Sequence, residues 1–174
     1  MSAVDDLTSR LALSSAFEPG NAAVGLLVAE HGAVRAVDLL TSGELANGER
    51  SSLTRRWLAG PWLDRAHHEI DQAAARGVSF VCPGSSAWPT QLDDLQERAP
   101  LVLRVKGTLE LRQAVARSVA VVGARAATRY GVWVAEDVSA QLANEGWCVV
   151  SGGAVGIDAA SHRGALAVNG PTIA

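Results

Sequence analysis

The 174-residue sequence lacks the features that are typical of membrane-spanning, secreted or zinc-binding proteins. No apolar run approaches the roughly 18 residues that a membrane-spanning helix requires. The chain starts with acidic residues, and no basic segment followed by an apolar core is present, so no secretory signal is expected. Its two cysteines, Cys82 and Cys148, fit no zinc-binding spacing. We expect both to be reduced, buried thiols of a cytoplasmic protein.

Acidic and basic residues are distributed unevenly along the chain, whose formal net charge is −3. Residues 1–98 contain 8 basic and 13 acidic side chains, whereas residues 99–174 contain 7 basic and 5 acidic ones. The second part is therefore net positive. Such asymmetry indicates two units with different roles.

The acidic part of the chain is expected to form a small all-α domain over residues 1–76. Capping residues and apolar spacing predict helices from Asp5 or Asp6 through about Phe17, at 22–30, at 33–40, near Trp57 and at 63–76. No Gly-x-Gly turn joins these helices, although a helical hairpin that grips a nucleic-acid backbone would need one. We therefore interpret the domain as a packing or protein-contact module.

Strands and helices alternate in residues 77–174. The pattern predicts strands at 78–82, 101–105, 118–122, 147–150 and 172–174, and helices at 129–145 and 157–168. The last three strands and the two helices are typical of the front part of a doubly wound parallel sheet, so the predicted fold class is α/β. The strand at 118–122 is expected to be buried on both faces. The inner face of the first helix is predicted to carry Val132, Ala135, Val138 and Leu142.

Two loops follow buried strands, at the edge where ligands of such sheets bind. The first loop comprises residues 123–128, and the second loop comprises residues 151–156. The second loop fits Gly-x-Gly-x-x-Gly with Ser151 in the first place, so that Gly153 would permit close backbone approach and Gly156 close helix packing. Each loop leads into a helix N-terminus, which offers unpaired amides to an anion. We predict that both loops bind phosphate, and the alternative is that the glycines only make tight turns.

Arginine and aromatic side chains accompany the first loop. Arg125 and Arg129 would add bidentate phosphate contacts to those of the amides, and acids are nearly absent from the surrounding segment. The only tyrosine, Tyr130, either stacks on a nucleobase or packs beneath its helix, and both interpretations stay open. The five tryptophans show no regular spacing and are expected in the core.

Other chemistries lack their signatures. The strand after the first loop ends in Ser151 rather than in the acid that a nicotinamide dinucleotide site needs. Neither the Walker sequence nor the Gly-x-Ser-x-Gly nucleophile elbow occurs. Asp158 and His162 are four residues apart, but two ligands do not make a metal site. Asp158 is better interpreted as a carboxylate that favours the helix dipole. No cofactor and no metal are predicted.

The two loops and their flanks resemble the family of DNA-processing protein A, also called DprA or Smf. The resemblance rests on residues 119–131 and 150–166 and extends upstream to 88–92, 99–101 and 106–107. It implies a domain similar to a sterile alpha motif (SAM-like) over residues 1–76. It further implies the front of an extended Rossmann-like domain over residues 77–174, truncated at Ala174.

The resemblance implies a non-enzymatic recombination mediator. Family members bind and protect incoming single-stranded DNA in natural transformation and help to load the recombinase RecA onto it. The family's loop residues correspond to Gly123, Ala124, Arg125, Ser151, Gly152, Gly153, Gly156 and Asp158, and Arg129 and Arg163 could extend the cationic groove. A homo-oligomer is implied for the full-length family.

Two further expectations concern this chain. A half sheet exposes an edge strand and apolar helix faces, so we expect poor stability or association. The alternative function is a nucleotide-binding Rossmann enzyme similar to the nucleoside-monophosphate phosphoribohydrolases. The Pro-Gly-Gly-x-Gly-Thr sequence of that group does not occur here.

Overall fold

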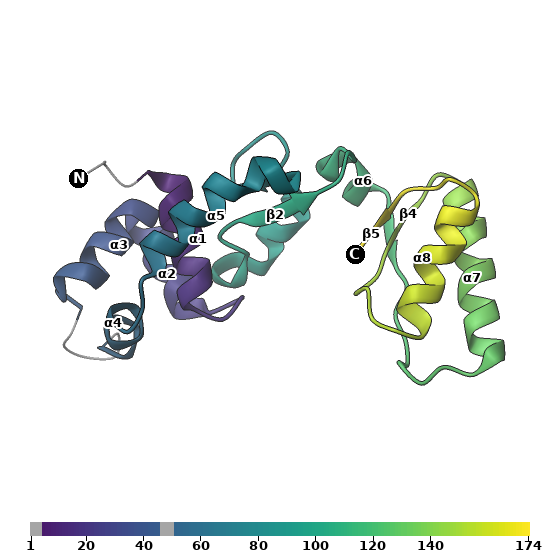
Figure 1. Ribbon diagram of the computed structural model, residues 1–174, viewed down its shortest axis with the longest axis horizontal. Helices are drawn as coiled ribbons and strands as arrows, with labels where there is room; N and C mark the ends of the chain where they lie inside the picture. The colour runs from purple at the N-terminus through teal and green to yellow at the C-terminus, as the bar shows by residue number, and fades with distance from the viewer. Residues whose placement is uncertain (1–4, 46–50) are drawn as a thin grey trace. The chain divides into compact units, whose positions relative to one another are not determined.

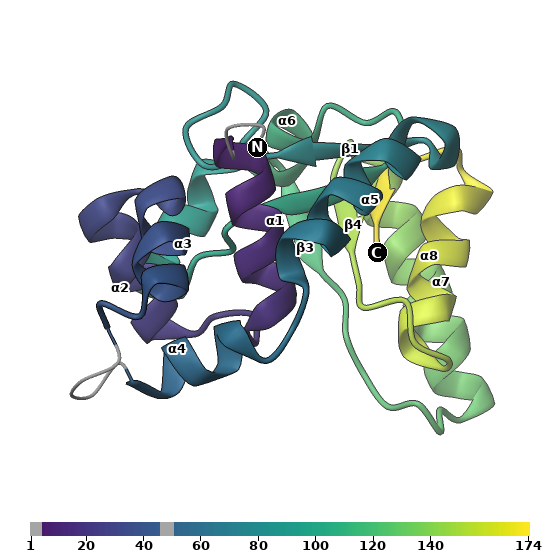
Figure 2. The same ribbon diagram turned by 60° about the vertical axis from the view of Figure 1, so that its left-hand side comes forward.

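A computed structural model describes residues 5–45 and 51–174 of the chain (Figures 1 and 2). The chain divides into two compact units, Met1–Thr108 and Leu109–Ala174, which we call the first and second units. The first four residues of the acidic start lie outside the described residues.

The predicted helices of the first unit are confirmed in the described residues. They are α1 (Asp6–Ala16), α2 (Ala22–His31), α3 (Ala33–Ser42), α4 (Ser51–Leu58) and α5 (Trp62–Arg76). The Asp5 carboxylate accepts a hydrogen bond from the amide of Thr8 at 2.7 Å and so caps α1. This bond lowers the pKa of Asp5 below its ordinary value. Gly77 ends α5 in the left-handed conformation.

Apolar side chains of these helices form the core of the first unit. Leu11, Leu27 and Leu40 are fully buried, and Trp57 and Trp62 are buried beside them. Each indole N–H finds an acceptor, since Trp57 donates to the Thr41 hydroxyl at 2.9 Å and Trp62 donates to the Trp57 carbonyl at 2.8 Å. Both indoles can be buried in the core because neither N–H group is left without an acceptor.

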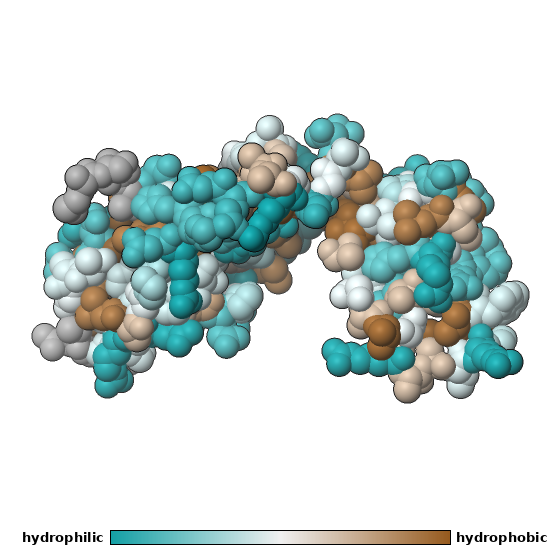
Figure 3. Space-filling model, viewed as in Figure 1, coloured by the Kyte–Doolittle hydropathy of each residue, from teal (hydrophilic) through white to brown (hydrophobic). Residues whose placement is uncertain are grey.

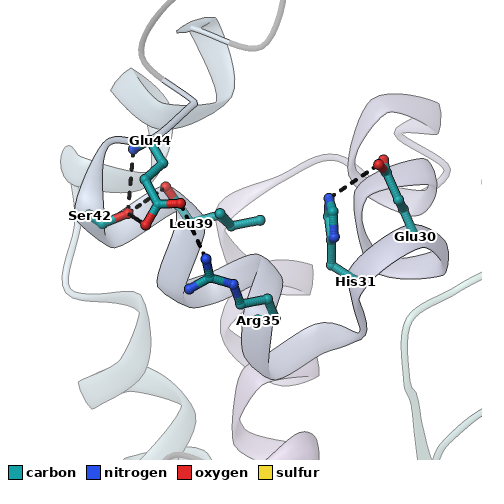
Figure 4. A network of polar contacts seen from close by, with 6 residues as sticks. All are labelled: Glu30, His31, Arg35, Leu39, Ser42 and Glu44. Atoms are coloured by element: carbon teal, nitrogen blue, oxygen red, sulfur yellow. Dashed lines mark hydrogen bonds and ion pairs between the residues drawn. The ribbon is translucent and has the colours of Figure 1, made fainter.

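Polar contacts on the surface of this unit surround the two ends of α3 (Figure 4). Arg35 forms an ion pair with Glu44 at 3.2 Å, and the Ser42 hydroxyl donates to the Leu39 carbonyl at 3.3 Å. His31 lies 3.4 Å from the Glu30 carboxylate at the end of α2. The Arg35 and Glu44 side chains are both more than half exposed, so their pair contributes little to stability.

A two-stranded antiparallel ladder completes the first unit. Strands β1 (Val78–Val81) and β2 (Leu103–Lys106) pair with each other, and the 3-10 segment η1 (Thr90–Arg98) lies between them in sequence. Val102 belongs to the core that the helices build. The compact units thus divide after residue 108, while the sequence suggests a domain boundary after residue 76; that boundary stays a prediction.

The second unit contains a small parallel sheet, as predicted. Its elements are α6 (Leu111–Ala116), β3 (Ser118–Ala120), α7 (Arg129–Asn144), β4 (Cys148–Val150), α8 (Ile157–Ala167) and β5 (Thr172–Ile173). Strand β4 lies between β3 and β5, and both pairings are parallel. Helices α7 and α8 lie side by side (Figures 1 and 2).

The expectation that the strand at 118–122 is buried on both faces is wrong. Val149 in the central strand is fully buried, but Ala120 is exposed and Val122 is 74% exposed. The central strand has a neighbour on each side, whereas β3 stands at the end of the strand order β3-β4-β5. Apolar patches lie among the polar surface of this unit (Figure 3).

The predicted inner face of α7 is also partly wrong. Val138 is 42% exposed, and the buried positions are Ala135, Ser139 and Ala143. The reason is the close approach of α8, since a Cβ atom at Gly164 would lie only 2.1 Å from the Glu136 carbonyl oxygen. Two backbones this close leave room only for small side chains between the helices.

Candidate functional site

The first and second loops contact each other through their backbones. The Ile157 amide donates to the Ala124 carbonyl at 3.2 Å. Gly156 has φ +93°, and a Cβ atom there would lie 2.3 Å from the same carbonyl oxygen. A Cβ atom at Gly123 would lie 2.7 Å from the Ile157 side chain. The structure thus brings the two predicted loops together, and Gly156 packs against the first loop.

Ser151 lies within the sheet at the start of the second loop. Its side chain is buried, and its hydroxyl donates to the Val121 carbonyl at 2.7 Å. Its amide donates to the Ile173 carbonyl at 3.0 Å. Ser151 therefore joins the ends of three neighbouring strands. Its hydroxyl proton is engaged in the bond to Val121 and is not available to donate to a ligand.

Two backbone amides at the N-terminus of α8 already have acceptors within the second unit. The Ile157 amide is taken by the first loop, and the Ala159 amide donates to the Ala154 carbonyl at 3.1 Å. The Asp158 carboxylate faces Gly152 closely enough that a Cβ atom there would lie 3.0 Å from Oδ2. Gly152 and Gly153 are exposed. A carboxylate already favours this helix end, which makes the second loop the less anion-attracting of the two.

The N-terminus of α7 is open by comparison. The Thr128 hydroxyl accepts the Gly131 amide at 3.1 Å, and helix geometry leaves the amides of Arg129 and Tyr130 without intrahelical acceptors. Arg125 and Arg129 are exposed. Within residues 5–45 and 51–174, neither side chain has a hydrogen-bond or ion-pair partner. This end of the helix therefore combines free amides with two uncompensated guanidinium groups.

Arg163 lies away from the loops, in the second half of α8. It forms an ion pair with Glu136 of α7 at 2.8 Å. Its charge is thus compensated locally, unlike the charges of Arg125 and Arg129. The structure does not bring Arg163 into the group of open cations.

His162 has a hydrogen-bond partner on one ring nitrogen, whereas its buried Nε2 has none among the described residues. His162 Nδ1 lies 2.7 Å from the Thr172 hydroxyl, so its partner is on β5.

No group of three or more potential metal ligands occurs in the part of the chain that the structure describes. No helix in this part is long and apolar enough to cross a membrane.

Two exposed aromatic residues on α7 were not predicted as a pair. Tyr130 is 74% exposed and Trp133 is 59% exposed, with ring centroids 6.2 Å apart and planes inclined by 30°. The expectation that all five tryptophans are in the core is therefore wrong for Trp133, and Tyr130 does not pack beneath its helix. Their i, i+3 spacing in the sequence could have predicted that the two rings lie on one side of the helix.

Comparisons with known proteins find similarity to a family and to several proteins that are named for DNA processing. Residues 79–174 match the family described as DNA recombination-mediator protein A. A putative DNA processing protein DprA of Mycobacterium tuberculosis is 38% identical over 172 residues, which cover 93% of this chain and 43% of that protein. The DNA processing protein DprA of Streptococcus pneumoniae is 42% identical over 87 residues, which cover 50% of this chain and 29% of that protein.

A solved structure supports the same assignment. The X-ray structure of DNA processing protein A from Streptococcus pneumoniae matches with a TM-score of 0.64 and 27% identity, over 94% of this chain and 54% of that one. The chain thus spans about half of that structure, and 43% of the length of its Mycobacterium tuberculosis relative. The match of more than half of its residues shows that the chain belongs to the DNA recombination-mediator protein A family.

Proposed function

We propose that the chain binds single-stranded DNA through the first loop and the N-terminus of α7. The observation that carries this proposal is the pair Arg125 and Arg129, both exposed and both without a compensating acid in the described residues. Guanidinium groups beside free helix amides suit the oxygens of a phosphodiester. The segment 117–135 contains no acidic residue that would repel the backbone.

In this proposal the two loops have different roles. Ala124, Arg125 and Arg129 contact phosphate, and Gly123 lets the second loop approach. In the second loop, Gly156 packs against the first loop and Ser151 bonds to Val121 just before it. Gly152 and Gly153, which are exposed, and Asp158 at the start of α8 stay proposed DNA contacts. Arg163 lies too far along α8 to share the same phosphate, since it is six positions after Ile157, which corresponds to about 9 Å along the helix axis.

The wider role that we propose is that of a recombination mediator. Relatives carry the names DNA processing protein and, for the family, DNA recombination-mediator protein. We propose a non-enzymatic protein that protects incoming single-stranded DNA and helps to load RecA in natural transformation, with the cytoplasm as its compartment. A SAM-like helical domain, a Rossmann-like sheet and a homo-oligomer of the longer protein belong to the same proposal.

A titration of a fluorescent single-stranded oligonucleotide, followed by anisotropy, tests the binding role. Arg125→Glu removes one contact and adds a repulsive charge, so we expect affinity to fall by about tenfold or more. Arg76→Glu is the matched control, because Arg76 is an exposed arginine at the end of α5 in the first unit. Equal affinities of the parent and Arg125→Glu would contradict the proposal. An equal loss in both variants would show that only the total charge matters.

A further inference from the structure

The most exposed aromatic side chains of the second unit form a pair on α7. Tyr130 is 74% exposed and Trp133 is 59% exposed, whereas Trp57, Trp62 and Trp88 are all at least 92% buried. The Tyr130 and Trp133 rings stack on each other with centroids 6.2 Å apart. Large aromatic faces left in water lose the hydrophobic gain of burial, and such rings are typical of binding surfaces.

These rings lie next to the proposed phosphate-binding cations. Arg129 precedes Tyr130 directly and is one helical turn from Trp133, at i, i+4 spacing. Acidic residues begin only at Glu136, on the next turn. The rings thus stand between a cationic and an acidic section of the same helix.

A shallow hollow of about 430 Å³ opens beside Trp133, between α7 and α8. Glu136, Asp137 and Arg163 contribute to its lining. Two carboxylates make it a poor place for phosphate, and the guanidinium of Arg163 is already paired with Glu136. A neutral ring with polar edges fits both the aromatic face and the charged groups, which offer hydrogen-bond donors and acceptors.

We propose that Tyr130 and Trp133 form a stacking platform for unpaired nucleobases, while Arg125 and Arg129 bind the adjacent phosphates. The inference rests on the proposed function and adds a contact to the bases themselves. Every base has a π-face, so the platform accepts any sequence. Its occupant is a single strand because the bases of a duplex are already stacked on each other.

The test compares an oligothymidylate with an abasic oligomer that has the same number of deoxyribose-phosphate units. We expect the 174-residue chain to bind the abasic oligomer at least about fivefold more weakly, since stacking contributes to single-strand binding base by base. We also expect only the oligothymidylate to quench tryptophan fluorescence, because Trp133 is the most exposed of the five tryptophans.

Variants of the platform separate ring chemistry from simple bulk. Trp133→Leu and Tyr130→Leu are expected to weaken oligothymidylate binding at least about fivefold and to leave abasic binding unchanged. Trp133→Phe keeps an aromatic face and is expected to retain binding while losing the fluorescence quench. Leu166→Ala on α8 is the control, because Leu166 is an apolar side chain with 60% exposure, similar to that of Trp133.

The outcomes distinguish this inference from the proposed function. Equal affinity for the two oligomers, with both reduced by Arg125→Glu, would overturn the stacking platform and retain the phosphate site. Binding of neither oligomer would overturn both. An unchanged affinity of Trp133→Leu for oligothymidylate would also overturn the platform and would point to a protein partner for these rings. Circular dichroism of each variant verifies that α7 is intact.

Discussion

The backbone amide of Ile157 donates to the carbonyl oxygen of Ala124 across 3.2 Å and so fastens the start of α8 to the first loop. The bond uses an amide that would otherwise face solvent at a helix N-terminus. It also sets the backbone immediately before Arg125. The second loop therefore supports the first. A substitution in the second loop should alter the proposed phosphate site even though it changes no charged residue.

Gly156 tests this support. Gly156→Ala places a Cβ atom 2.3 Å from the Ala124 carbonyl oxygen at φ +93°, so we expect a loss of about 3 kcal/mol or more in the stability of the second unit. Gly153→Ala is the control, because its φ is +69° but its nearest neighbour would be 3.7 Å away, and we expect a loss of about 1 kcal/mol. Hydrogen exchange of the amides of α8 measures the loss of stability in both variants. Equal losses would contradict the close contact between Gly156 and Ala124.

The α7–α8 interface gives a second pair of glycine variants. Gly164→Ala would bring a Cβ atom to 2.1 Å from the Glu136 carbonyl oxygen and is expected to destabilise the pair of helices by about 2–3 kcal/mol. Gly131→Ala meets nothing closer than 3.4 Å and improves helix propensity, so a change within about 1 kcal/mol is expected. Urea unfolding followed by exchange of α7 and α8 checks both. A tolerated Gly164→Ala would contradict the close approach.

The ion pair between Arg163 and Glu136 is expected to have little effect on stability. Both side chains are more than a third exposed, so Glu136→Gln should change the free energy of unfolding by less than about 1 kcal/mol. The same variant leaves Arg163 uncompensated and removes an acid near the platform, so single-strand affinity should rise. Arg163→Ala should lower affinity less than Arg125→Ala does. Anisotropy titrations at one salt concentration compare the single-strand affinities of these three variants. A larger loss for Arg163→Ala than for Arg125→Ala would contradict the distinction between the paired Arg163 and the unpaired Arg125.

The buried thiol of Cys148 predicts a pH dependence. Burial raises the pKa of Cys148 above its ordinary value, so the folded state holds the thiol proton more tightly than the unfolded state. The contribution of this thiol to the free energy of unfolding is complete below the pKa of about 8.5 that a cysteine has in the unfolded state. It is lost as the pH rises toward the higher pKa of the folded state. The parent should therefore lose more stability than Cys148→Ala when urea unfolding is repeated at increasing alkaline pH. Parallel curves for the two proteins would contradict it.

The capping residues predict the helices of the first unit well because a cap is a local interaction. Asp5 and Gly77 begin and end helices within their own turns. The parallel sheet also follows from the order of apolar runs. Sequence spacing could not show that Val138 and Trp133 face solvent, because the buried side of α7 is set by how closely Gly164 lets α8 approach.

The site shows the same division between local and tertiary information. The two loops and Arg125 could be identified from glycine spacing and from the absence of nearby acids. The pairing of Arg163 with Glu136, the buried hydroxyl of Ser151 and the joining of Ala124 to Ile157 all depend on contacts between elements far apart in the sequence. These contacts divide the predicted residues into open and supporting ones.

The salt dependence of single-strand binding is the decisive measurement for phosphate binding at the first loop. Each phosphate neutralised on a single strand contributes about −0.7 to the slope of log K against log salt. We expect a clear negative slope for the parent, a slope shallower by about 0.7 or more for Arg125→Glu, and the parental slope for Arg76→Glu. Binding that does not depend on salt, or identical slopes for the parent and Arg125→Glu, would contradict phosphate binding at the first loop.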